Sequence, residues 1–125
     1  MLKHRHNYQH LNYHLVFSTK YRQKIINDKM LTELRHVINE RALELVFIVH
    51  ILNGYLDHIH ILISIPPKYS LSEIFKIIKG YSSFKIKELR WQNGFAAFTV
   101  DKNSFSTIFD YIKNQEDHHK KIDLK

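Results

Sequence analysis

The chain of 125 residues has no cysteine, three glycines and two prolines. Without cysteine, disulfides, thiolate metal sites and cysteine nucleophiles are excluded, so any metal site would need histidine, carboxylate or amide ligands. The scarcity of glycine and proline, with no low-complexity segment or repeat, indicates a densely structured chain. The length and the 44% hydrophobic content suit a single domain, residues 1–125, with one core.

A long apolar run is also missing. No stretch approaches the roughly 20 apolar residues that span a bilayer. The first ten residues, MLKHRHNYQH, lack the apolar core of a secretory signal. We therefore expect a cytoplasmic protein with no membrane partner.

Acidic residues are fewer than basic ones. The chain has 12 acidic and 19 basic residues, and its formal net charge is +7. Such a balance favours a polyanionic partner such as nucleic acid. The alternative is that the basic side chains only form solvated helix faces. The candidate DNA-binding residues fall in two groups, one after the first predicted strand and one in the middle helices: Lys20, Arg22, Lys24, Lys76, Lys79 and Lys85.

Hydrophobic patterning predicts four strands and three helical regions. The strands are expected at residues 11–19, 46–54, 58–65 and 95–100. Helices are expected at residues 29–45, from Ser70 to about Leu89 with Gly80 as a stop or kink, and at 105–118.

Capping residues support the helix starts. Asp28 is the expected cap of the first helix, and Ser70 with Glu73 forms a capping box for the second. Asn103 or Ser104 is expected to cap the last helix.

The element order is β-α-β-β-α-β followed by a helix, which indicates an α+β, ferredoxin-like fold. In that fold two helices cover one face of an antiparallel four-stranded sheet. The other face is then open to His58 and His60, while Ile59, Ile61 and Ile63 point into the core. The C-terminal helix is expected to lie against this open face.

His58 and His60 flank one isoleucine in the strand IHILISIP, so both imidazoles lie on one face and can bind one cation. A histidine pair alone is more often structural than metal-binding. The second signal is YIKNQ, where Tyr111 and Gln115 are four residues apart and share a helix face. The Gln115 amide oxygen is the first-ranked third ligand, with Asp57, Glu116 and Asp117 as alternatives.

These residue types suit metal-assisted attack on a phosphodiester. A tyrosine hydroxyl ionises near pH 10, so it needs a cation or a base to act as a nucleophile. Mixed nitrogen and oxygen ligands favour Mn²⁺ and tolerate Mg²⁺. Attack by Tyr111 would conserve the bond energy as a phosphotyrosine and permit rejoining without ATP.

At this point the chain resembles the single-tyrosine transposases of the HUH superfamily, which include insertion-sequence transposases and their REP-associated relatives. The DHIHILISIP and YIKNQE blocks, in this order, are highly specific to that family. The resemblance extends over most of the chain, through YHLVFSTKYR (13–22), GYLDHIHILISIPPKYS (54–70), KGYSSFKIKE (79–88), WQNGFAAFTV (91–100) and YIKNQEDHHKK (111–121).

The resemblance implies His58, His60 and Gln115 as metal ligands and Tyr111 as the nucleophile. It also implies cleavage of single-stranded DNA through a 5′-phosphotyrosine, recognition of hairpins at element ends, and a homodimer. In such dimers the tyrosine helix of one subunit often completes the active site of the other. The sequence does not distinguish the transposase of an active mobile element from a domesticated REP-associated nuclease.

Two other functions compete with a transposase. A non-catalytic ferredoxin-like module could bind single-stranded nucleic acid through aromatic side chains on its sheet, and would need neither motif. A small metal-dependent phosphodiesterase that uses water would need the histidines but not Tyr111.

Overall fold

The computed structural model describes residues 11–115. Its elements follow the predicted order with small shifts at their ends. They are β1 (Leu11–Ser18), the short 3₁₀ helix η1 (Lys20–Arg22), α2 (Asp28–Leu45), β2 (Ile48–Tyr55), β3 (His58–Ile65), α3 (Leu71–Lys85), β4 (Ala96–Thr99) and α4 (Phe105–Lys113).

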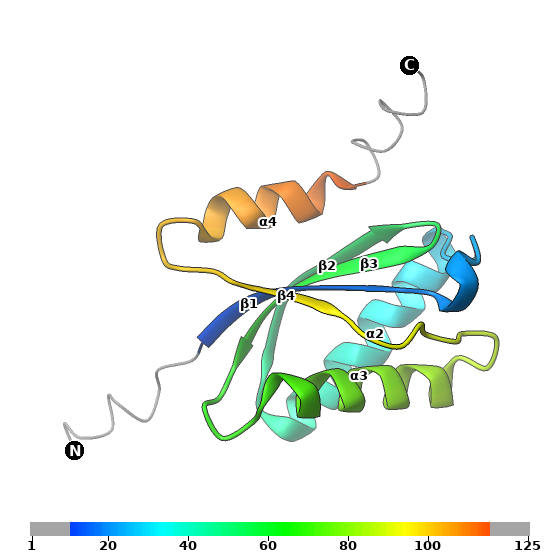
Figure 1. Ribbon diagram of the computed structural model, residues 1–125, viewed down its shortest axis with the longest axis horizontal. Helices are drawn as coiled ribbons and strands as arrows, with labels where there is room; N and C mark the ends of the chain where they lie inside the picture. Colours follow the sequence, from blue (N-terminus) through cyan, green and yellow to red (C-terminus); the bar gives the residue numbers. More distant parts are fainter. Residues whose placement is uncertain (1–10, 116–125) are drawn as a thin grey trace.

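The four strands form one antiparallel sheet in the order β2-β3-β1-β4. Helices α2 and α3 cover one face of this sheet, and α4 lies across the other (Figure 1). The predicted α+β fold and the predicted position of the last helix are therefore confirmed. None of the helices within residues 11–115 is long and apolar enough to cross a membrane.

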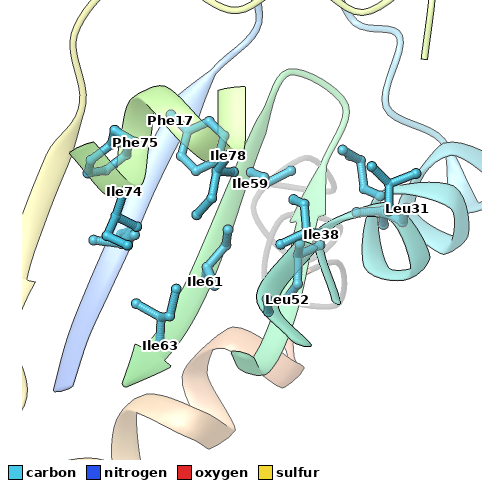
Figure 2. Packing of buried hydrophobic residues seen from close by; sticks show 14 of the residues in the cluster. Phe17, Leu31, Ile38, Leu52, Ile59, Ile61, Ile63, Ile74, Phe75 and Ile78 are labelled. Carbon is cyan, nitrogen blue, oxygen red and sulfur yellow. The ribbon is translucent and has the colours of Figure 1, made fainter. Parts of the chain in front are cut away.

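Strand β3 lies between β2 and β1, and its alternate side chains divide the molecule into two layers. Ile59, Ile61 and Ile63 are fully buried and pack beneath α2 and α3 (Figure 2). On the opposite face Leu62 packs with Ile112 of α4 in a smaller cluster. The period of two along β3 thus directs His58 and His60 towards the α4 side.

Helix α3 runs without a break through Gly80, so the predicted stop or kink there is wrong. The buried residues Ile74 and Ile78 belong to the main core, and Ser82 one turn further on is also buried. Burying this continuous stripe outweighs the roughly 1 kcal/mol that a glycine costs inside a helix. The helix ends at Lys85, four residues earlier than predicted.

The capping predictions are partly confirmed. Both hydrogen bonds of the Ser70–Glu73 capping box are present. Helix α2 is capped by Asn27 instead of Asp28, since the Asn27 side chain accepts a hydrogen bond from the Met30 amide. At the start of α4 the Ser104 side chain makes no capping bond, and Asp101 accepts from the Ser104 amide instead.

Candidate active site

His58 and His60 lie side by side on the sheet face that α4 crosses. Their ring centroids are 5.1 Å apart and the two ring planes are nearly perpendicular. His60 is only 7% exposed, and the His58 side chain is 13% exposed. The pair is therefore held in a sheltered place at the start of β3.

Helix α4 carries Tyr111 to the histidines of the same chain. The Tyr111 ring centroid lies 5.9 Å from that of His60, and the phenol is 45% exposed. Segments that are 51 residues apart in the sequence are thus brought together by the packing of α4 on β2 and β3. A nucleophile in this position would be open to a large substrate on one side and close to a bound cation on the other.

Gln115 is fully buried one turn beyond Tyr111. Its Nε2 donates a hydrogen bond of 3.3 Å to the Tyr111 carbonyl. Its Oε1 has no hydrogen-bond partner within residues 11–115. A buried acceptor without a partner is costly, so an oxygen in this state is a good candidate for a metal ligand.

Asn53 fastens this end of α4 to the sheet. It pairs with His60 across β2 and β3, so its side chain lies on the same face. Its Nδ2 donates 3.0 Å hydrogen bonds to the carbonyls of Ile112 and Lys113. Sequence reasoning missed Asn53, because only the strand register shows that this asparagine stands opposite a histidine.

Asp57 supports His58 from the turn before β3. Its Oδ1 lies 2.8 Å from His58 Nδ1, and its Oδ2 lies 3.1 Å from Arg22 Nε. Burial acts to raise the pKa of Asp57, but the hydrogen bonds from His58 and Arg22 outweigh it and leave the pKa below its usual value. The lowered pKa favours the charged carboxylate, which can accept a hydrogen bond from the Nδ1–H of His58.

His14 on β1 is a second residue that sequence reasoning left outside the site. Its Nε2 lies 2.8 Å from His60 Nδ1, and the two rings stack with centroids 5.0 Å apart. Its ring also meets the edge of Tyr111 at 6.2 Å. Burial lowers the pKa of His14, which favours its neutral imidazole.

A divalent metal fits these residues chemically. Within residues 11–115 no group of three or more His, Cys, Asp or Glu could hold a metal ion, so an amide is needed beside the histidine pair. The orphaned Oε1 of Gln115, two residues beyond the end of α4, supplies such an oxygen. Of the alternative third ligands, Asp57 is already bonded to His58 and Arg22. Glu116 and Asp117 lie outside the described residues. Helix α4 ends at Lys113, so the predicted continuation to residue 118 is wrong at Asn114, which caps the helix with non-helical backbone angles.

The basic candidates lie in two separate places. Lys20 and Arg22 belong to η1, which Arg22 links to Asp57, and Lys24 follows in the chain. Lys76, Lys79 and Lys85 belong to α3, on the sheet face away from α4 (Figure 1). Lys79 donates hydrogen bonds to the carbonyls of Gln92 and Gly94, and burial lowers its pKa. A role in DNA binding stays a prediction for all six.

Comparison with known proteins shows the family of this chain. A family model described as "Transposase IS200 like" matches residues 7–115. The chain belongs to the IS200-like transposase family. Its membership makes it a DNA-processing enzyme of the transposase class.

Two relatives of this IS200-like transposase match most of its length. The transposase for insertion sequence element IS200 of Salmonella typhimurium is 34% identical over 134 aligned positions, covering 92% of this chain and 83% of the relative. The ISDra2 transposase TnpA of Deinococcus radiodurans is 26% identical, covering 86% of this chain and 85% of the relative.

Solved structures share the fold of this transposase. A Deinococcus radiodurans R1 protein described as a transposase superposes with a TM-score of 0.69 at 24% identity, covering 86% of this chain and 92% of that one. A REP-associated tyrosine transposase bound to a REP hairpin superposes with a TM-score of 0.70 at 18% identity. The match covers 87% of this chain and 68% of that one.

Proposed function

We propose that this transposase cleaves and rejoins single-stranded DNA in a divalent-metal-dependent reaction with Tyr111 as the nucleophile. The observation that carries the proposal is the approach of Tyr111 and His60 to 5.9 Å between ring centroids, with the buried Gln115 oxygen just beyond the end of the tyrosine helix. These are the three functional groups that metal-assisted attack on a phosphodiester requires.

In the cleavage step the Tyr111 oxygen attacks the scissile phosphorus. A bond forms between that oxygen and phosphorus, the bond from phosphorus to the 3′ oxygen breaks, and the phenolic proton is lost to solvent. The 3′ oxygen takes up a proton and leaves as a hydroxyl. The products are a 5′-phosphotyrosine and a free 3′-hydroxyl, and attack by another 3′-hydroxyl reverses the step and joins new ends.

His58, His60 and Gln115 would hold the metal, either Mg²⁺ or Mn²⁺. When bound, this ion supplies Lewis-acid polarisation of the scissile phosphate and offsets the charge that develops during displacement. Asp57 and the β3 backbone orient His58, and the Asn53 hydrogen bonds hold the end of α4 in reach of the histidines.

The substrate we propose is single-stranded DNA carrying hairpins, and the active form we propose is a homodimer. The hairpin is supported by the relative in fold that was solved with a REP hairpin. The net charge of +7 favours a polyanion, and the exposed face of Tyr111 suits a polymeric substrate. An insertion-sequence enzyme and a domesticated nuclease would share this chemistry.

A cleavage assay with labelled single-stranded hairpin DNA tests the proposal. The wild-type protein should cut in Mg²⁺ or Mn²⁺ and stop in EDTA. Tyr111→Phe should lose cleavage but keep DNA binding, because only the hydroxyl is removed. His58→Ala and His60→Ala should each lose cleavage through the metal site.

Other outcomes would point to the competing functions. Cleavage by Tyr111→Phe at the wild-type rate, with loss in the histidine variants, would indicate a phosphodiesterase that uses water. Binding without cleavage by the wild-type protein would indicate a non-catalytic module. The structure disfavours that module, because α4 crosses the sheet face on which bases would have to stack (Figure 1).

A further inference from the structure

His14 is a buried neighbour of His60 to which the proposed function gives no task. We propose that His14 is a positioning residue that accepts a hydrogen bond from the Nδ1–H of His60. This bond would hold His60 in the tautomer whose Nε2 lone pair is directed to the metal. The inference rests on the proposed function, since it assumes that His60 is a metal ligand.

The argument starts from the protons on the two metal-site histidines. A neutral imidazole carries one N–H and one lone pair, and a ligating nitrogen must present the lone pair. For His58 the choice is made by Asp57, because its carboxylate at 2.8 Å from Nδ1 can only accept. For His60 the corresponding position, 2.8 Å from Nδ1, is filled by His14 Nε2.

The surroundings of His14 hold its ring in this orientation. On β1 it stands opposite Leu62 of β3 and Phe98 of β4. Its ring contacts those of His60, Phe98 and Tyr111, with centroid distances of 5.0, 5.8 and 6.2 Å. An imidazole packed on three sides is well placed to fix the proton of a neighbour before any metal binds.

The first test determines the tautomer of His60 in the wild-type protein. Long-range ¹H–¹⁵N NMR spectra of the metal-free wild-type protein at pH 8 distinguish a protonated from an unprotonated ring nitrogen. The inference predicts that His60 carries its proton on Nδ1. A proton on Nε2 of His60 would overturn it.

The second test measures Mn²⁺ affinity by calorimetry, without DNA, for two substitutions of similar size. His14→Leu removes the acceptor and should weaken Mn²⁺ binding by about 10–100-fold. His14→Gln keeps an acceptor oxygen near the former Nε2 and should bind Mn²⁺ nearly as well as wild type. Circular dichroism and thermal unfolding of the metal-free variants provide the check on folding.

A His60→Ala control distinguishes failure of the positioning role of His14 from failure of the proposed metal site. If His60→Ala loses Mn²⁺ binding while both His14 variants keep it, the positioning role is wrong and the metal site stands. If His14→Gln loses binding as fully as His60→Ala, His14 is itself a ligand and the inference is also wrong. Unchanged binding in His60→Ala would overturn the proposed metal site, and the inference with it.

Discussion

Gln115 illustrates how a single residue can serve the site at a cost to the folded chain. Its side chain is fully buried and its Oε1 lacks a hydrogen-bond partner within residues 11–115. Gln115→Leu removes this acceptor, so the metal-free protein should gain about 1 kcal/mol in unfolding free energy. The same change should abolish tight Mn²⁺ binding and cleavage.

Gln115→Glu is the matched control. A carboxylate keeps a ligand oxygen and should retain Mn²⁺ binding, but its charge is buried without a partner when the metal is absent. In urea unfolding the metal-free Leu variant should therefore be more stable than the Glu variant. In calorimetry the Glu variant should bind Mn²⁺ more tightly than the Leu variant. A Leu variant that keeps wild-type Mn²⁺ affinity would remove Gln115 from the ligand set.

At the scale of helices and strands, two glycines differ in how closely their surroundings are packed. A Cβ on Gly54 of β2 would lie 2.2 Å from the His58 carbonyl oxygen, whereas one on Gly80 of α3 meets nothing within 4 Å. Gly54→Ala should cost about 1–3 kcal/mol, as overpacked sites do. It should also weaken Mn²⁺ binding, since the strand that carries His58 must move.

Gly80→Ala should instead stabilise the protein by about 0.5–1 kcal/mol and leave Mn²⁺ binding unchanged. Urea unfolding curves measure both effects. Equal stabilities for the two alanine variants would show that β2 and β3 do not approach closely at Gly54.

The capping box of α3 predicts a pH dependence. Glu73 accepts a hydrogen bond from the Ser70 amide, and this bond, with that of the Ser70 side chain, lowers the pKa of Glu73. A lowered pKa in the folded state stabilises the protein above the pKa of the unfolded chain, about 4.3. That stability is lost as the pH falls through the lower, folded value.

Comparison with Glu73→Gln isolates this effect, because glutamine keeps the capping geometry without the charge. In urea unfolding the wild-type protein should be the more stable at pH 7, and the difference should begin to shrink near the unfolded pKa of about 4.3 and vanish once Glu73 is protonated in the folded protein as well. A difference that stays constant from pH 7 to pH 3 would contradict the assignment.

Local patterns were enough to predict some parts of the fold and the site. The Ser70–Glu73 box follows from a spacing of three residues, and the shared face of His58 and His60 follows from the period of a strand. The roles of His14 and Asn53 were not predictable, because each depends on the register between strands. The prediction of a helix stop or kink at Gly80 was wrong because it used only the low helix propensity of glycine. The burial of a whole face of α3 outweighs that propensity.

At the scale of the whole molecule, α4 packs on the sheet of its own chain (Figure 1), and we propose that each active site is built from a single chain. We therefore expect that co-expressed Tyr111→Phe and His60→Ala chains do not restore cleavage in mixed dimers. A wild-type chain paired with the double variant should keep one working site. Restored cleavage in the first mixture and loss in the second would show that the tyrosine helix acts on the other subunit.

The identity of the nucleophile is the central claim, and mapping a covalent DNA adduct tests it most directly. The protein is incubated with single-stranded hairpin DNA and Mn²⁺, digested with protease and nuclease, and sequenced by tandem mass spectrometry. We predict a 5′-nucleotide attached to Tyr111, absent in EDTA and absent from Tyr111→Phe. An adduct on another residue, or DNA cleavage at the wild-type rate by Tyr111→Phe, would contradict the account.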